Sequence, residues 1–262
     1  MPFVWIEPPV EQADVILVVG LHANGAVGRF DKDPFEIVID DAAAAVSYIN
    51  PLTAWALTIS THKIKEGDWF LQTAAASSVG KFVLQLAQHY RFKTINVIRR
   101  REQETIIRNL GGDEVICTAD EDLRSRLQEL TAGKGVERAI DCVAGDLGAE
   151  IARNLAPAGT MLVYGALSSH RQTDPAKFIM PLFAPRLIYS TATVRGWWLP
   201  RWVPSQPLAE VRAATSDLLT MLSKGALTPP ASVRYPVKDF REAVSLADGE
   251  AGQEKVLLDF AD

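Results

Sequence analysis

Short apolar runs alternate with helical patterns from Gly67 onward, and this alternation is the strongest constraint that the sequence places on the fold. The predicted strands cover residues 68–73, 94–99, 114–118, 138–143, 160–165 and 190–195. Helices are predicted between them at 78–90, 101–110, 120–131, 146–155 and, less regularly, 174–187. Repeated strand–helix units with continuously apolar strands build a parallel sheet that is covered on both faces. We therefore expect an α/β protein with a doubly wound parallel sheet of the Rossmann type.

A turn of small residues joins the first predicted strand to the first helix. The turn covers Ala74–Gly80, and apolar residues recur at helical spacing after it. A tight turn that opens a helix offers backbone N–H groups to a pyrophosphate. Against the pattern G-x-G-x-x-G only Gly80 is kept, because Ala75 and Ser77 stand at the first two glycine positions. The turn is interpreted as a phosphate loop, although an ordinary strand–turn–helix unit has the same pattern.

Three consecutive arginines, Arg99, Arg100 and Arg101, follow the second predicted strand. At this position of a dinucleotide-binding fold, a carboxylate accepts the ribose 2′-hydroxyl of NAD, whereas guanidinium groups suit the 2′-phosphate of NADP. The triplet predicts NADPH as the cofactor. The alternative is a solvated basic start of a helix.

The composition excludes several classes of partner. A formal net charge of −5 gives no basic field for DNA or RNA, so no nucleic-acid partner is expected. No apolar stretch approaches the roughly 20 residues that cross a bilayer, so no membrane association is expected. With 48% hydrophobic residues, a chain of 262 residues can bury a substantial core.

The cysteines and histidines give no sign of a metal site. Cys117 and Cys142 fall in predicted strands without a ligand spacing, and the four histidines are scattered. Buried free thiols are typical of a reducing compartment. The start of the sequence also lacks the pattern of a signal peptide, so we expect a cytoplasmic protein. From the spacing of the cysteines and histidines we expect no bound metal.

The two ends of the chain stand outside the strand–helix alternation. An amphipathic helix is predicted after Pro207, and the tail is expected to form a strand from Val233, a helix over 237–247 and a strand over 255–260. We expect a nucleotide-binding domain over 46–228, with residues 1–45 and 229–262 belonging together.

Segments in a fixed order along the chain resemble the motifs of one family. They are Ile49–Trp55, Gly67–Gly80, Thr94–Arg99, Leu110–Val115, Ala139–Val143, Tyr164–Gly165, Val194–Leu199 and Gly252–Leu257. Together they resemble the medium-chain dehydrogenase/reductase superfamily, in particular mitochondrial-type enoyl thioester reductases and quinone-reductase-like proteins. The resemblance runs from about Ile49 to Phe260.

The resemblance implies an NADPH-dependent oxidoreductase that transfers a hydride to an activated C=C of a small molecule, such as an enoyl thioester, enone or quinone. The cofactor contacts that it implies are Asn50 and Thr53 on the nicotinamide–ribose side; the backbone of Ala76, Ser77, Ser78 and Val79 at the pyrophosphate; Arg99, Arg100 and Arg101 at the 2′-phosphate; Tyr164, Gly165, Ala166 and Leu167 at the end of a strand; Trp197, Trp198 and Leu199 beside the nicotinamide; and Lys255.

Several of these residues have a second interpretation. Tyr164 and the tryptophans are also typical of core or dimer-interface aromatics, and Lys255 of a solvated strand residue. Asp141 is expected to be a structural hydrogen-bonding residue rather than a catalytic one. No catalytic residue is assigned.

The sequence departs from the family at its N-terminal side. We expect residues 1–45 to be a remnant of a GroES-like β domain, with Ala13–Val19 as its opening strand and Gly25–Phe30 as a later turn. Counterparts of the reductases' proton-donating tyrosine and of the alcohol dehydrogenases' zinc ligands are absent from the match. Gly20–Gly28 is not interpreted as a second phosphate loop, because no regular strand–helix unit follows it.

Two alternative functions remain open at this point: a catalytically reduced NADPH-binding or dimer-forming module, and an alcohol dehydrogenase-like enzyme. A homodimer is expected because the final strand, near 190–196, would otherwise expose a sheet edge. In the proteins that the sequence resembles, two cofactor domains join across that edge.

Overall fold

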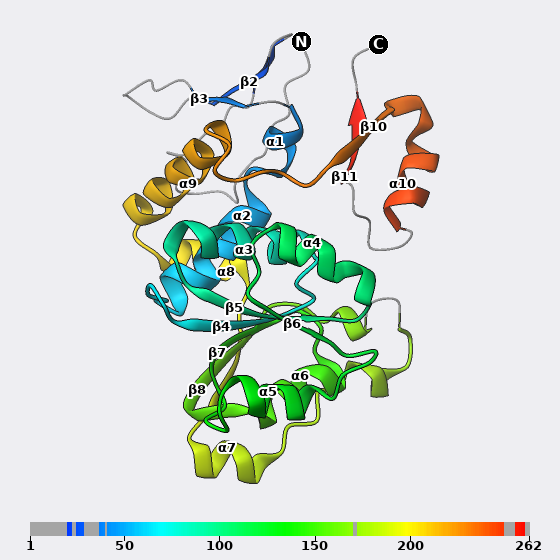
Figure 1. Cartoon of the computed structure of the whole chain (residues 1–262). Coiled ribbons are helices and arrows are strands. Elements are labelled where there is room, and N and C mark those ends of the chain that lie inside the picture. The colour runs from blue at the N-terminus through cyan, green and yellow to red at the C-terminus, as the bar shows by residue number, and fades with distance from the viewer. Residues whose placement is uncertain are drawn as a thin grey trace. The chain divides into compact units, whose positions relative to one another are not determined.

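A computed structural model describes residues 20–22, 25–28, 37–39, 41–169, 172–248 and 255–259 (Figure 1). The chain divides into two compact units. The central unit covers Thr53–Ser205, and the terminal unit combines Met1–Leu52 with Gln206–Asp262. Each unit is described by itself.

A six-stranded parallel sheet forms the middle of the central unit, in the order β6-β5-β4-β7-β8-β9. Its strands are β4 (Trp69–Thr73), β5 (Lys93–Ile98), β6 (Glu114–Cys117), β7 (Val136–Asp141), β8 (Leu155–Val163) and β9 (Thr193–Gly196). The chain runs outward from β4 to β5 and β6 and then returns to β7 on the other side of β4. The pair β4–β7 is therefore the topological switch point, and the order is that of a dinucleotide-binding sheet.

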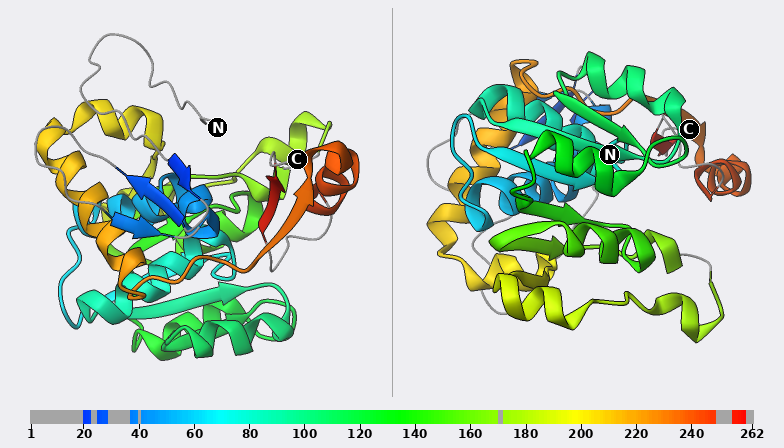
Figure 2. Two further views of the ribbon diagram at one scale, coloured as in Figure 1. Left: turned by 90° about the horizontal axis from the view of Figure 1, so that it is seen from above. Right: turned by 60° about the horizontal axis from the view of Figure 1, so that its bottom comes forward.

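Helices cover both faces of this sheet (Figures 1 and 2). The helices of the central unit are α3 (Ser78–Tyr90), α4 (Glu104–Asn109), α5 (Leu123–Leu130), α6 (Gly145–Arg153), α7 (Ala184–Ser190) and the short α8 (Leu199–Trp202). Residues of α3 and α4 pack in one hydrophobic cluster, and residues of α5 and α6 pack in another.

Strand β5 shows how the sequence produces these two layers. Successive side chains of a strand point to opposite faces of the sheet. Ile95 and Val97 pack with α5 and α6, whereas Ile98 packs with α3 and α4. All three side chains are almost completely buried, and removing such a side chain from water stabilises the fold by about 1.5–3 kcal/mol.

The terminal unit contains two small sheets. Strands β1 (Gly20–His22), β2 (Gly25–Gly28) and β3 (Ile37–Ile39) pair antiparallel, and α9 (Leu208–Ser223) contacts β3. Strands β10 (Ser232–Pro236) and β11 (Lys255–Asp259) form a parallel pair that contacts α10 (Phe240–Asp248). Helix α1 (Asp41–Val46) also belongs to this unit, and α2 (Ile49–Trp55) leads into the central unit, where a π-helical segment over Ala56–Thr61 follows it.

The predicted Rossmann-type sheet is confirmed, and α3 begins and ends at the predicted residues. The helix expected over 174–187 is wrong: a 3₁₀ turn at Pro175–Phe178 and the separate helix α7 take its place. Residues 157–159, between the predicted helix over 146–155 and the predicted strand over 160–165, lie inside β8, where the pairing with β7 shifts register. Extra residues in a ladder carry the same local signal as a turn, because both need an irregular backbone.

The boundary of the nucleotide-binding domain also differs from the expected range 46–228. Helix α9 is grouped with the terminal unit because it contacts β3, and the central unit ends at Ser205. The expected strand Ala13–Val19 lies outside the described residues. Gly25–Gly28, expected in a turn, forms β2 and pairs with β1, so this glycine-rich segment is a hairpin and not a phosphate loop.

Candidate cofactor-binding site

The predicted phosphate loop joins β4 to α3 at the switch point. Ala74 adopts a left-handed conformation with φ of 47°, and the backbone N–H of Ser77 donates to the Ala74 carbonyl oxygen at 2.8 Å. The Ser77 hydroxyl then caps α3 by accepting the N–H of Gly80 at 3.2 Å. The first turn of α3 carries no acidic side chain, so the positive end of the helix dipole is not opposed from within the helix. This arrangement suits a pyrophosphate.

Gly80 is required by the close packing of α3 on the loop. A Cβ atom at this position would lie 2.3 Å from the carbonyl oxygen of Ala75, which is too close for any side chain. This is the packing role of the third glycine in dinucleotide-binding loops. Ser77, at the second glycine position, has an extended backbone with φ of −68°, so glycine is not needed there.

A buried hydrogen-bonded link connects the two strands of the switch point. The Thr73 hydroxyl donates to Oδ1 of Asp141 at 2.6 Å and accepts the N–H of Cys142 at 3.1 Å. The Asp141 carboxyl group also accepts the N–H groups of Val143 at 2.9 Å and Ala144 at 3.0 Å. Thr73 and Asp141 are both fully buried. The structural role expected for Asp141 is confirmed, because it fixes the loop that follows β7 to the end of β4.

The loop after β8 lies against this link. The N–H of Tyr164 donates to the Asp141 carbonyl oxygen at 2.8 Å, and that of Leu167 to the Cys142 carbonyl oxygen at 2.9 Å. The Tyr164 residue is only partly exposed, and its hydroxyl lies beside the Cys142 thiol and the Ser77 hydroxyl. Burial raises the pKa of Tyr164 well above its ordinary value and raises that of Cys142 to about 11. Ala166 and Leu167, at the outer end of the loop, are exposed.

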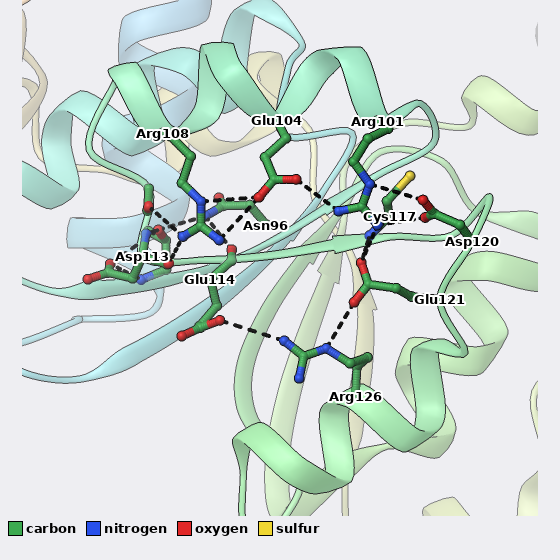
Figure 3. Close-up of polar contacts among 12 residues, drawn as sticks. Asn96, Arg101, Glu104, Arg108, Asp113, Glu114, Cys117, Asp120, Glu121 and Arg126 are labelled. Atoms are coloured by element: carbon green, nitrogen blue, oxygen red, sulfur yellow. Dashed lines mark hydrogen bonds and ion pairs between the residues drawn. The ribbon is translucent and has the colours of Figure 1, made fainter.

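The three arginines after β5 have different surroundings. Arg99 is exposed and pairs with no carboxylate among the described residues. The backbone N–H of Arg100 donates to the side-chain carbonyl oxygen of Gln103 at 3.3 Å. The Arg101 guanidinium forms ion pairs with three carboxylates, those of Glu104, Asp120 and Glu121 (Figure 3). The structure thus leaves the predicted phosphate contact open to Arg99 and gives Arg101 carboxylate partners.

The predicted aromatic segment divides into buried and exposed residues. Trp197 is buried, and its indole N–H donates to the Thr61 hydroxyl at 3.3 Å. Its ring packs against Trp202, with centroids 6.2 Å apart. Leu199 is also buried, whereas Trp198 is 62% exposed. Of the three residues, only Trp198 presents an open side chain, and Trp197 has the alternative structural role that the sequence left open.

The remaining predicted contacts lie partly in the other unit. Thr53 is buried at the start of the central unit. Asn50 and Lys255 belong to the terminal unit, so their cofactor contacts stay predictions. Ala76, Ser78 and Val79 lie in the phosphate loop and the first turn of α3, as expected.

Sequence reasoning missed two acidic residues, Asp120 and Glu121, which follow β6. Their position in the sequence could have indicated this role. Strand β6 pairs in parallel with β5, so the residues that follow the two strands meet at the same edge of the sheet. Among the residues that the structure describes, no group of three or more His, Cys, Asp or Glu side chains is placed to hold a metal ion. Within the same part of the chain, every helix is too short or too polar to span a bilayer.

The strand order and the phosphate loop define a dinucleotide-binding α/β protein. The zinc-binding dehydrogenase family model matches residues 78–216, which is just over half of the chain. The chain belongs to this family and hence to the medium-chain dehydrogenase/reductase superfamily.

The relatives named enoyl-[acyl-carrier-protein] reductase, mitochondrial, are about 30% identical to this chain over the residues that align. The mouse protein is 30% identical over 209 residues, which cover 77% of this chain and 53% of the relative. The Xenopus tropicalis protein is 32% identical over 227 residues, which cover 82% and 62%. The chain thus spans little more than half the length of these curated relatives.

Solved structures show the same fold. A Bacillus thuringiensis protein assigned as an NADPH:quinone reductase has a TM-score of 0.78 at 28% identity, over 92% of this chain and 69% of the other. The Escherichia coli quinone oxidoreductase complexed with NADPH has a TM-score of 0.71 at 25% identity, over 85% of this chain and 68% of the other.

Proposed function

We propose that this chain binds NADPH at the carboxyl edge of the central sheet and acts as a reductase that transfers hydride to an activated C=C. The observation that carries the proposal is the phosphate loop on α3 at the switch point, followed by Arg99 at the end of the adjacent strand β5. The loop suits the pyrophosphate, and Arg99 suits a 2′-phosphate. NADPH supplies the hydride, and the protein positions it.

Arg99 favours NADPH over NADH by its charge and its exposure. The residue that directly follows β5 is an arginine and not the acidic residue that accepts a ribose 2′-hydroxyl. A guanidinium–phosphate contact is charge-assisted and can be bidentate. Because Arg101 is already paired with carboxylates, Arg99 makes the first contact with the 2′-phosphate in the proposed complex.

The acceptor class is inferred from the relatives. They are named enoyl-[acyl-carrier-protein] reductase and quinone oxidoreductase, and both names describe reduction of a conjugated acceptor. We therefore propose an enoyl thioester, enone or quinone as the small-molecule substrate. A catalytically reduced NADPH-binding module is the second candidate, because the loop at α3 and Arg99 account for cofactor binding, whereas no side chain is assigned to the chemistry.

A paired measurement of binding and turnover tests the proposal. Titration with NADPH and NADH, followed by cofactor fluorescence, should show saturable binding with a preference for NADPH. In the presence of a crotonyl thioester, a small enone or a quinone, NADPH should be oxidised, which is measured as a loss of absorbance at 340 nm. Binding without turnover favours the module, and no saturable binding of either nucleotide contradicts both candidates.

We also propose a homodimer that joins across β9. This strand is at the end of the sheet order, and its residues are mostly exposed. Large apolar side chains near it in the chain are exposed as well, among them Phe183, Ile188 and Tyr189. An open sheet edge beside exposed apolar residues is a surface that proteins usually pair or cover. A single species of monomer mass in light scattering at micromolar concentration would contradict the homodimer.

A cytoplasmic location is proposed from the thiols. Cys117 and Cys142 are both buried and form no disulfide, as is usual in a reducing compartment. Fractionation of cells that express the chain tests this, and enrichment in an organelle fraction would contradict it.

A further inference from the structure

The carboxyl ends of β5 and β6 hold an ion-pair network centred on Arg101 (Figure 3). The guanidinium donates to both carboxylate oxygens of Asp120, at 2.7 and 3.0 Å. It also donates to Glu104 at 2.8 Å and to Glu121 at 2.8 Å. Its side chain is 44% exposed, so water and solutes reach this network. The arginine that the sequence assigns to the 2′-phosphate is thus bound to acidic groups of the protein itself.

The carboxylates differ in what else they bind. Glu121 accepts the backbone N–H of Cys117 at 2.9 Å and the Arg126 guanidinium at 2.9 Å, so it also fastens the end of β6 to α5. Glu104 lies in the first turn of α4 and pairs with Arg108 as well. Asp120 is the most exposed of the three carboxylates, at 50%, and Arg101 is its main partner. Its pair with Arg101 is therefore the one that a ligand can replace with the least disturbance of the fold.

We propose that Asp120 is a specificity-determining residue of the cofactor site, because the 2′-phosphate of NADPH must replace Asp120 as the bidentate partner of Arg101. This inference rests on the proposed NADPH site. A phosphate and a carboxylate offer the same fork of oxygens to a guanidinium, so the two anions compete for one set of N–H donors. NADH carries no 2′-phosphate and leaves the Arg101–Asp120 pair intact.

The competition has a definite sign. Asp120 repels a 2′-phosphate that approaches Arg101, and it also lowers the gain from contacting Arg101. Asp120 therefore weakens NADPH binding and leaves NADH binding nearly unchanged. The preference for NADPH is then set by two neighbouring groups: Arg99 raises it, and Asp120 limits it.

Asp120→Asn in the full chain is the direct test. The substitution keeps the shape of the side chain and removes its charge, so Arg101 is released for the phosphate. Exposed ion pairs contribute little, so the NADPH dissociation constant should fall by roughly fivefold, with that of NADH unchanged. Adenosine 2′,5′-bisphosphate should show the same gain as a competitor, and 5′-AMP should show none. In an Arg101→Ala background, Asp120→Asn should give a smaller gain for NADPH, because only the repulsion between Asp120 and the 2′-phosphate is then removed.

Asp122→Asn is the matched control, because it removes the same charge two residues away. Asp122 caps α5 by accepting the N–H of Ser125 at 2.8 Å, and Asn caps helices equally well. This control should leave both dissociation constants unchanged. The inference is overturned if wild type binds NADPH and Asp120→Asn binds it with unchanged or weaker affinity, or if Asp122→Asn gives the same gain. If neither wild type nor Asp120→Asn binds any nucleotide, the proposed function fails, and the inference fails with it.

Discussion

Two aspartates stand at the same edge of the central sheet, and their surroundings are opposite. Asp141, the last residue of β7, is fully buried and accepts hydrogen bonds from a hydroxyl and two backbone N–H groups. Asp120, just after β6, is half exposed and binds mainly one arginine. Both carboxyl groups are well hydrogen-bonded, so the difference between them is access to water.

Access to water decides what each aspartate can do. The donors around Asp141 have no water to turn to, so losing the carboxyl group leaves them unpaired at a cost of roughly 1–3 kcal/mol each. The donors of Arg101 can exchange Asp120 for water or for an anion with little change in free energy. The buried hydrogen bonds of Asp141 therefore fix the shape of the site, whereas the exposed ion pair of Asp120 can change and alter the specificity for the cofactor.

The largest effect is expected from Asp141→Ala. It removes the acceptor of Thr73, Val143 and Ala144 at a site where water does not replace it. We expect the free energy of unfolding to fall by about 3–5 kcal/mol, measured by urea denaturation. Asp146→Ala, an exposed acidic residue in the first turn of α6, is the control and should cost about 1 kcal/mol or less. Equal losses for the two variants would remove the contrast between buried and exposed aspartates.

His62 gives the buried region a pH dependence. Its Nε2 atom lies 3.1 Å from the Ala139 carbonyl oxygen, and burial lowers its pKa from 6.5 to about 4. The unfolded chain therefore takes up this proton near pH 6.5, and the folded protein only near pH 4. Stability is fully present above pH 6.5 and falls by about 3 kcal/mol as the pH drops to about 4.

Urea denaturation between pH 7 and pH 4 measures this loss. His62→Gln should flatten the profile in that window, although it lowers stability at pH 7. His89→Gln is the control, because it removes a second histidine from an exposed position. An unchanged slope in His62→Gln would assign the acid sensitivity to other groups.

Arg99→Ala is expected to act on binding and not on folding. Loss of one partly screened, charge-assisted contact should weaken NADPH binding by about tenfold and leave NADH nearly unchanged. Arg124→Ala removes the same charge from an exposed position on α5 and serves as the control. Fluorescence titration checks both. If Arg99→Ala weakens NADPH and NADH alike, Arg99 does not read the 2′-phosphate.

The fold was predictable because its signals are local. Apolar strands, helical spacing and the small-residue loop each lie within a few residues of one another, and Gly80 alone marked the packing of α3 on the loop. The position of α9 was not predictable in this way. Its apolar face fits several partners equally well, and only the three-dimensional structure shows that it contacts β3.

The site was predictable only as far as one strand determines it. Arg99, Arg100 and Arg101 follow one another in the sequence, yet their surroundings differ because Asp120 and Glu121 come from the end of another strand. The same holds for Trp197 and Trp198, of which one is buried and one exposed. The residue types and their spacing within one segment do not predict which side chains from another strand will contact that segment.

The smallest effect is expected at Tyr164, which belongs to the buried part of the carboxyl edge of the central sheet. A tyrosine donates the proton in the reductases that the sequence resembles, and Tyr164 is a tyrosine directly after β8 at the carboxyl edge of the sheet. In the structure its hydroxyl lies beside Cys142 and Ser77, and burial raises its pKa well above the ordinary value. A hydroxyl held inside in this way supports the phosphate loop and is poorly placed to give a proton to a substrate.

Tyr164→Phe should therefore leave NADPH oxidation within about tenfold of wild type, whereas loss of a true general acid costs roughly 10²–10⁴-fold. The NADPH dissociation constant should rise slightly, because Ser77 loses a neighbour in the loop. Tyr48→Phe in the terminal unit, where burial also raises the tyrosine pKa, is the parallel variant. A hundredfold loss of turnover in Tyr164→Phe with unchanged NADPH affinity would make Tyr164 the donor after all. It would also show that a buried group at this edge takes part in the chemistry and does not only shape the site.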